Sequence, residues 1–159
     1  MTGTPTPSSD RELVISRIIA ASRDKVYHCW AEPELIKQWF APRPRSTQHA
    51  ETDVRPGGAN LVAMKSPEGQ EFPNRGVYLE VVPNERLVIT DAYNSAWQPS
   101  NKPFFTAVLT FEKAGHGRTM YTACARHWTV KAMEEHKKMG FHDGWMKCAE
   151  QLEEVGRRL

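Results

Sequence analysis

Hydrophobic residues near the start of the chain show first a strand-like and then a helix-like spacing. Within residues 13–19, Leu13, Ile15 and Ile18 predict a first strand. Two short helices are predicted next, at 23–30 and 34–40, because apolar side chains recur there on one helical face. Ser22 is a suitable N-cap for the first helix, and Pro33 suits the first turn of the second.

The middle of the chain changes to short β-rich segments that are separated by turn signals. Pro and Gly stand where tight connections need them, in RPGG, SPEG, VPNE and AGHG at 55–58, 66–69, 82–85 and 114–117. The strands predicted around these turns cover residues 46–53, 59–65, 75–82, 86–93, 105–113 and 118–128. Such short connections favour an antiparallel meander, and residues 94–103 are expected to form a surface loop.

The last segment, residues 130–159, carries one apolar stripe at helical spacing. The stripe consists of Phe141, Trp145, Cys148, Leu152 and Val155. Charged side chains mostly occupy the other faces, so one long amphipathic helix is expected. Gly140 and Gly144 predict a kink or a close approach to the sheet near its start.

Together these elements predict an α+β fold with a curved, seven-stranded antiparallel sheet. Its inner face needs a cover, and only the C-terminal helix is long enough to provide one. A cavity is expected between them, because a curved sheet and a straight helix cannot touch everywhere. Residues 11–159 are expected to form a single domain, preceded by a disordered tail of residues 1–10 that offers nothing to bury.

Composition and charge narrow the range of partners. The formal net charge is +2 and the basic residues are scattered, which argues against nucleic acid as a partner. No apolar run approaches the roughly 20 residues that span a bilayer. Residues 1–10 lack the basic and apolar regions of a signal peptide, so no membrane partner and a cytoplasmic location are expected. Cys29, Cys124 and Cys148 lie far apart, which fits reduced thiols better than disulfides.

Several short motifs, in their order and spacing, resemble one protein family. They are AEPELIKQWF at 31–40, DVRPGG at 53–58, Met64 with PEG at 67–69, GVYLE at 76–80, PNERL at 83–87 and GW at 144–145. The chain is similar to the Bet v 1/START-like helix-grip (SRPBCC) superfamily, and within it to the activator-of-Hsp-ATPase-homologue-like, polyketide cyclase-like subgroup. The resemblance implies the helix-grip fold but no single activity, since members include ligand carriers, cyclases, hydrolases and chaperone regulators.

The alternation of side chains along the strands indicates which residues face the expected cavity. Small alanines opposite a bulky helix leave room for a ligand, and Asn60 stands where the family often has a large aromatic residue. The residues expected to bind a ligand are Trp39, Phe40, Asn60, Val62, Met64, Tyr78, Trp97, Tyr121, Ala123, Ala125, His127, Phe141 and Trp145. In the alternative interpretation, the alanines are ordinary core beneath Phe141 and Trp145, and most of the other aromatic residues are core as well.

Two titratable residues are candidates for acid/base chemistry. His127 on a cavity wall is a candidate general base, although a strand-end histidine bonded to the backbone is an equal alternative. An inward orientation of Tyr78 and Glu80 is implied by the resemblance, because residues 77–82 have apolar side chains on both faces. Glu80 would then be a buried carboxylate, whereas the alternative places it on the solvent side.

Metal and cofactor motifs are missing from the sequence. His136 and His142 are not spaced to share a metal ion, and neither HxxxH nor CxxC occurs, so no metal site is expected. Neither G-x-G-x-x-G nor a Walker loop occurs, and no cofactor is expected.

Three functions remain in order of preference. The first is the binding of a small hydrophobic or aromatic molecule between the sheet and the C-terminal helix. The second is a cyclase or hydrolase acting on a polyketide-like substrate through His127 or Glu80. The third is regulation of a chaperone ATPase, which the family name alone suggests. The sequence leaves a homodimer open.

Overall fold

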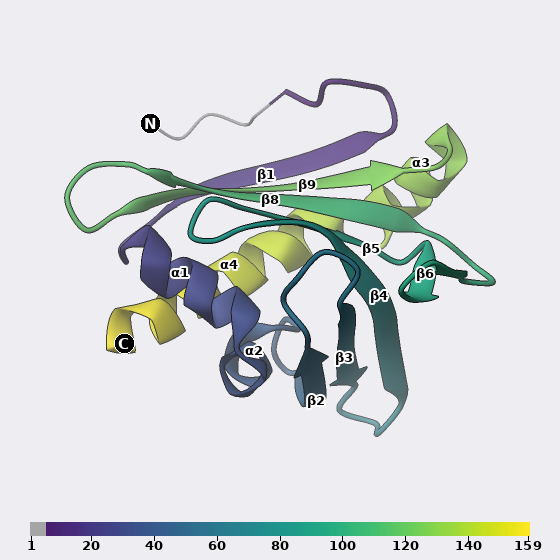
Figure 1. The fold of residues 1–159 in the computed structure, drawn as a ribbon, viewed down its shortest axis with the longest axis horizontal. Helices are drawn as coiled ribbons and strands as arrows, with labels where there is room; N and C mark the ends of the chain where they lie inside the picture. The colour runs from purple at the N-terminus through teal and green to yellow at the C-terminus, as the bar shows by residue number, and fades with distance from the viewer. Residues whose placement is uncertain (1–5) are drawn as a thin grey trace.

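The computed structural model describes residues 6–159 of the chain. In chain order, its elements are β1 (Glu12–Ile19), α1 (Arg23–Ala31), α2 (Pro33–Trp39), β2 (Ser46–Thr52), β3 (Ala59–Lys65), β4 (Glu71–Val82), β5 (Arg86–Thr90), β6 (Tyr93–Ser95), β7 (Gln98–Pro99), β8 (Phe105–Lys113), β9 (Thr119–His127), α3 (Val130–Lys138) and α4 (Phe141–Arg158). Figure 1 shows α1, α2 and α4 on the same side of the large sheet, with α3 at one end. The sheet therefore has an inner face under the helices and an outer face.

Seven strands form one antiparallel sheet, which confirms the predicted α+β fold. Their order is β1-β9-β8-β5-β4-β3-β2, so the last strand lies between the first strand and the rest of the meander. The predicted turns connect successive strands; for example, the N–H of Gly69 donates to the carbonyl of Ser66 between β3 and β4. The sequence thus predicted the strands of the sheet correctly; the differences lie at strand ends and at one bulge within β4.

Strand β4 is longer than expected. It begins at Glu71 rather than at residue 75 and includes Pro73, which has no N–H to donate. Proline is tolerated here because residues 71–76 pair with β3, whereas β5 pairs with β4 only from Val77 onward. The proline therefore faces no second neighbouring strand.

The expected surface loop at 94–103 contains a small hairpin. Strands β6 and β7 pair with each other in a separate sheet. Trp97 lies in the turn between them with a left-handed backbone (φ 59°) and packs edge-on against Tyr93. This hairpin contacts β4 and does not extend the large sheet.

A β-bulge at Leu79 reverses the alternation along β4. Tyr78 pairs with Ile89, and Glu80 pairs with the next residue of β5, Val88. Leu79 is therefore an extra residue of β4 that has no partner on β5. Tyr78 and Glu80 consequently lie on opposite faces of the sheet, although they are two residues apart. An alternation rule applied to the sequence cannot detect this change.

The C-terminal segment forms two helices instead of one. Helix α3 ends at Lys138, and Gly140 has a left-handed conformation (φ 92°) before α4 begins at Phe141. Glycine adopts this conformation without the penalty that a Cβ atom brings. The predicted long helix is therefore corrected to two helices, with the break at one of the two predicted glycines.

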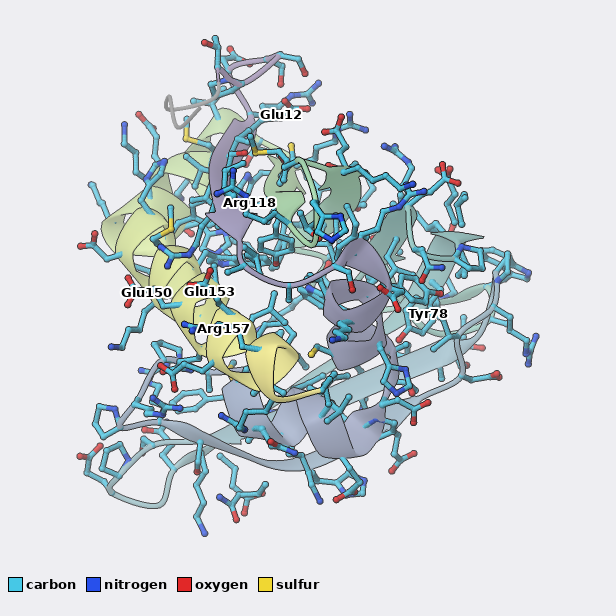
Figure 2. The ribbon with its side chains drawn as sticks, turned by 90° about the vertical axis from the view of Figure 1, so that its left-hand side faces the viewer. Glu12, Tyr78, Arg118, Glu150, Glu153 and Arg157 are labelled. Carbon is cyan, nitrogen blue, oxygen red and sulfur yellow. The ribbon has the colours of Figure 1, made fainter. Side chains whose placement is uncertain are left out.

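Gly144 does not approach the sheet. A Cβ atom added there would meet nothing within 4 Å, whereas one added at Gly156 would lie 3.1 Å from the Cβ of Ala21. The close approach of α4 to its surroundings is thus at its C-terminal end. Figure 2 shows the neighbouring charged side chains Glu153 and Arg157 along the same helix.

The substitution Gly144→Ala is expected to stabilise the protein by about 0.5 to 1 kcal/mol. Alanine restricts the unfolded chain and favours the helix, and the site has space for the added methyl group. Urea unfolding of the two proteins measures the difference. Gly156→Ala is the matched control, because Ala21 crowds that position and the same gain should not appear there.

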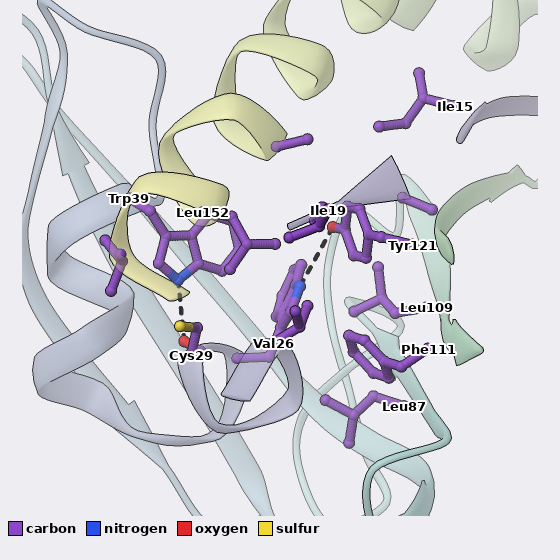
Figure 3. Packing of buried hydrophobic residues seen from close by; sticks show 14 of the residues in the cluster. Ile15, Ile19, Val26, Cys29, Trp39, Leu87, Leu109, Phe111, Tyr121 and Leu152 are labelled. Carbon is purple, nitrogen blue, oxygen red and sulfur yellow. Dashed lines mark hydrogen bonds between the residues drawn. The ribbon is translucent and has the colours of Figure 1, made fainter. Parts of the chain in front are cut away.

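The core fills the space between the inner face and the helices. Figure 3 shows Trp39 of α2 and Leu152 of α4 beside each other, with Val26 of α1 and the inner-face residues nearby. The inner-face residues of this core include Leu13, Ile15 and Ile19 of β1, Leu87 of β5, Leu109 and Phe111 of β8, and Tyr121, Ala123 and Ala125 of β9. Strands β1, β8 and β9 thus each contribute alternate residues to one cluster.

Residues 1–5 of the expected disordered tail lie outside the described residues. Within the rest of the tail, the backbone N–H and the hydroxyl of Ser8 donate to a carboxylate oxygen of Glu12, at 2.9 and 2.7 Å. The other carboxylate oxygen of Glu12 accepts from Arg126 of β9 at 2.8 Å. Among the helices of residues 6–159, none combines the length and apolar character needed to cross a membrane.

Candidate functional site

Two histidines form a hydrogen-bonded pair at one end of the inner face. His127 ends β9, and His136 lies in α3, directly after a short connection. The Nε2 atom of His127 and the Nδ1 atom of His136 are 2.8 Å apart, and both side chains are buried. The hydroxyl of Thr129 accepts from the N–H of Ala132 and caps α3, which fixes the helix that carries His136.

The backbone determines which ring nitrogens carry protons. The Nδ1 atom of His127 lies 2.8 Å from the carbonyl oxygen of Arg11, and a carbonyl only accepts, so Nδ1 is protonated. When both rings are neutral, His127 Nε2 accepts from the Nδ1–H of His136. The remaining nitrogen of the pair, His136 Nε2, is then an acceptor. In the structure His127 is therefore a strand-end histidine bonded to the backbone, as the alternative interpretation of the sequence expected.

Burial keeps His136 neutral near pH 7. Removal of the ring from water, with a further contribution from the neighbouring His127, lowers the pKa of His136 from 6.5 to about 4. His136 as a whole is only 8% exposed. A neutral ring agrees with the proton arrangement that the Arg11 carbonyl dictates.

Aromatic rings surround His136. Its ring centroid lies 4.9 Å from that of Phe104 and 5.0 Å from those of Phe105 and Phe141. Phe105 is also the cross-strand neighbour of His127, and Trp145 packs against Phe141 with centroids 5.2 Å apart. The histidine pair is therefore a polar element enclosed by an aromatic wall.

Asp91 holds two of these phenylalanines in place. Its carboxylate accepts from the backbone N–H of Phe104 at 2.9 and 3.0 Å and from that of Phe105 at 3.2 Å. Burial raises the pKa of Asp91, and these hydrogen bonds oppose the rise. Strand β5 ends at Thr90, earlier than expected, and the chain continues from Asp91 into the β6–β7 hairpin.

A second polar pair lies on the inner face of β3 and β4. The amide nitrogen of Asn60 donates to the hydroxyl of Tyr78 at 3.1 Å. Tyr78 is fully buried, and this burial raises its pKa to about 12, so its hydroxyl stays neutral. Both residues were expected on the inner face, and the structure brings them together.

The residues expected along β9 lie within the packed core. Ala123 and Ala125 are fully buried, and the hydroxyl of Tyr121 accepts from the indole N–H of Trp30 at 3.2 Å. Phe141 is buried in the same cluster, and Trp145 is half-buried against it. The space over the two alanines is therefore occupied by side chains.

The other expected residues are spread over the structure, although the rings of Trp39 and Phe40 pack edge-on with centroids 5.4 Å apart. Val62 forms a small cluster with Ile36 and Ala50, with Phe40 packed against it, and Met64 is half-buried further along β3. Trp39 belongs to the main core, where its indole N–H donates to the carbonyl of Cys29 (Figure 3). Trp97 is 61% exposed in the β6–β7 hairpin. The structure therefore does not gather these residues into one site.

The expected inward orientation of Glu80 is wrong. The bulge at Leu79 places Glu80 on the outer face, where its carboxylate accepts from Arg86 at 3.1 Å. Its side chain is 47% exposed. Glu80 is thus a solvent-facing ion-pair partner and not a buried acid.

Two hollows on the surface of residues 6–159 lie away from the histidine pair. One, of about 360 Å³, is lined by Ser22, Arg23, Asp24, Asn84, Lys113, Gly115, His116, Gly117 and Arg118. The other, of about 790 Å³, is lined by Arg23, Glu80, Val82, Glu85, Arg86, Thr110, Phe111, Glu112 and Lys113. Neither is the predicted space between the sheet and α4. A ligand in that space would have to displace side chains that now fill it.

Sequence reasoning missed His136, Asp91 and Phe104, although a signal for His136 exists. Thr129 is a typical N-cap, and Met133 and His136 then follow at helical spacing on one face. Met133 packs against the core, so the sequence could have placed His136 beside His127. Within residues 6–159, no group of three His, Cys, Asp or Glu side chains is arranged to hold a metal ion.

Comparison with known proteins identifies the family. The family described as Activator of Hsp90 ATPase homolog 1-like protein matches residues 20–156, whereas no curated protein matches the chain. A solved structure of a protein from Nitrosomonas europaea is 38% identical, with a TM-score of 0.91 over 96% of this chain and 97% of that chain. A protein from Mycobacterium smegmatis, 20% identical, has the same fold with a TM-score of 0.80 over 97% and 95% of the two chains. The chain therefore belongs to the Activator of Hsp90 ATPase homolog 1-like family, within the helix-grip superfamily that its motifs resemble.

Proposed function

We propose that the protein binds a small hydrophobic or aromatic molecule between the inner face of the sheet and the α3–α4 segment. The observation that supports this function is the aromatic wall around the hydrogen-bonded pair His127–His136. Ligand sites in proteins combine an apolar lining with a few polar groups that fix orientation. The family membership agrees with this function, since helix-grip domains include ligand carriers.

The half-buried residues of the core indicate where the ligand enters. Phe105, Met133, Trp145 and Met146 pack against the core cluster but remain partly exposed. They come from β8, α3 and α4; the rings of Phe105 and Trp145 pack edge-on with centroids 6.1 Å apart, and Trp145 lies in the first turns of α4 after the break at Gly140. Methionine side chains adapt readily to a new neighbour. The ligand would take the space that these side chains now fill.

NMR of the indole N–H groups tests this site with 1-methylnaphthalene as the probe. The chain has five tryptophans, and the variants Trp145→Phe and Trp97→Phe assign the two signals of interest. We expect the probe to shift the Trp145 signal, while the signal of Trp97, exposed in the β6–β7 hairpin, stays in place. At a concentration ten times the Kd, binding should also add about 1.4 kcal/mol to the unfolding free energy.

Two results would contradict the proposed site. An unchanged Trp145 signal together with an unchanged melting temperature would show that the probe does not bind there. A shift of the Trp97 signal alone would place binding at the β6–β7 hairpin instead. Either result removes the space beneath α3 and α4 as the ligand site.

A further inference from the structure

The histidine pair has one ring nitrogen that the protein leaves without a partner. Hydrogen bonds occupy both nitrogens of His127 and the Nδ1 atom of His136. No hydrogen bond within residues 6–159 involves the Nε2 atom of His136, although the side chain is 92% buried. Nε2 is not among the fully buried side-chain atoms that lack a partner, so solvent reaches it, and a donor group of a ligand can take the place of that solvent. This nitrogen is therefore the atom of the site that can select among ligands.

The proton arrangement defines what His136 Nε2 recognises. The Arg11 carbonyl fixes the proton on His127 Nδ1, so in a neutral pair the proton of His136 is on Nδ1 and its Nε2 presents a lone pair. A lone pair accepts a hydrogen bond from an O–H or N–H group and offers nothing to a carboxylate. The low pKa of His136, about 4, keeps it from becoming a cation that would attract an anion.

The rings around His136 restrict the shape of the molecule that can reach it. Phe104 and Phe105 are tilted against the imidazole, and Phe141 meets it edge-on at 77°. Such a setting favours a flat aromatic molecule, because aromatic pairs gain most in tilted and edge-to-face contacts. Phe104, Phe105 and Phe141 carry no charge, so these rings offer no cation to pair with an anionic ligand.

We propose that the ligand class is a neutral aromatic alcohol, a phenol, whose hydroxyl group donates to Nε2 of His136. This inference rests on the proposed function and adds the chemical group that the site selects. It separates phenols from plain aromatic hydrocarbons, which leave Nε2 unsatisfied, and from aromatic carboxylates, which would place a negative charge against a lone pair.

Three probes of similar size test the proposal: 1-naphthol, 1-methylnaphthalene and 1-naphthoate. Their dissociation constants are measured at pH 7.5 for the natural protein and for His136→Phe, which keeps a ring of similar size. The ratio of the 1-methylnaphthalene Kd to the 1-naphthol Kd cancels the general hydrophobic contribution of each probe. We expect this ratio to be about fivefold higher in the natural protein than in the variant. 1-Naphthoate should bind most weakly to the natural protein.

A second measurement does not depend on the variant folding. In protein labelled with ¹⁵N at histidine, 1-naphthol should shift the Nε2 signal of His136, whereas 1-methylnaphthalene should leave it unprotonated and largely in place. Equal ratios in both proteins, or no ¹⁵N shift with 1-naphthol, would overturn the phenol inference while binding of 1-methylnaphthalene still supported the proposed function. Absence of binding by all three probes would overturn both. Stronger binding of 1-naphthoate would show that the site selects anions and would overturn the phenol inference.

Discussion

Replacing Gln151 with methionine is expected to lower the free energy of unfolding by about 3 to 5 kcal/mol. Gln151 lies in α4 and is only 1% exposed. Its amide nitrogen donates to the carbonyls of Trp39 and Ala41, at 2.8 and 2.9 Å, and its amide oxygen accepts from the N–H of Arg43 at 3.1 Å. Methionine keeps the length of the side chain but leaves all three backbone groups without these partners.

The segment that Gln151 holds is itself unfavourable in isolation. Ala41 is buried with a left-handed backbone (φ 88°), which costs an L-residue about 1 to 2 kcal/mol. Hydrogen bonds from α4 on both sides of this residue offset that cost. The same contacts join the connection between α2 and β2 to α4, so Gln151 sets how close the C-terminal helix lies to the paired short helices.

Urea unfolding at pH 7.5 measures the effect, and Gln48→Met is the matched control. Gln48 is exposed in β2, so the same exchange there should change the unfolding free energy by less than about 0.5 kcal/mol. A loss below about 1 kcal/mol for Gln151→Met would show that the three hydrogen bonds are not needed to hold the connection. A loss equal in the two variants would point to a general effect of methionine.

The sequence was sufficient for the order of elements because the signals involved are local. Turn motifs such as RPGG at 55–58 depend on backbone conformations that few residues adopt, and the α4 stripe depends on helical periodicity. The break at Gly140 was detectable as a glycine, but not as a full interruption of the helix, since glycine is also tolerated within helices. Pro73 likewise concealed the start of β4, because its tolerance depends on which strands lie beside it.

The candidate site was only half predictable, because its chemistry depends on tertiary contacts. Alternation placed His127 on the inner face, and the family resemblance placed Tyr78 and Glu80 there, but the bulge at Leu79 puts Glu80 on the outer face. The hydrogen bond from His136 to His127 joins α3 to β9. The positions of the protons on the two imidazole rings follow from the carbonyl of Arg11, which directly precedes β1. The Thr129 N-cap and the helical spacing of His136 carry a signal for the first contact, whereas no single-sequence pattern indicates the second, which joins residues 116 positions apart.

The protein is expected to lose about 2 kcal/mol of unfolding free energy between pH 7.5 and pH 5.0 because of His136. Burial lowers the pKa of this residue to about 4 in the folded protein, whereas the unfolded chain regains the ordinary value of 6.5. Between these values the unfolded state binds more protons than the folded state, so stability falls as the pH falls. The contribution is complete above pH 6.5 and is lost progressively towards pH 4.

The variant His136→Phe separates this effect from the other titrating groups. Burial raises the pKa of nearby Asp91, whereas hydrogen bonds lower the pKa values of the distant Glu12 and Glu153; all three carboxyl groups are present in both proteins, so they contribute to both pH profiles. His28, His49, His116 and His142 are exposed and are present in both proteins, as is His127. Urea midpoints at several pH values should therefore show a steep pH dependence in the natural protein and a shallower one in the variant. Equal slopes would mean that His136 does not stay neutral in the fold, and the acceptor nitrogen on which phenol binding depends would be lost with it.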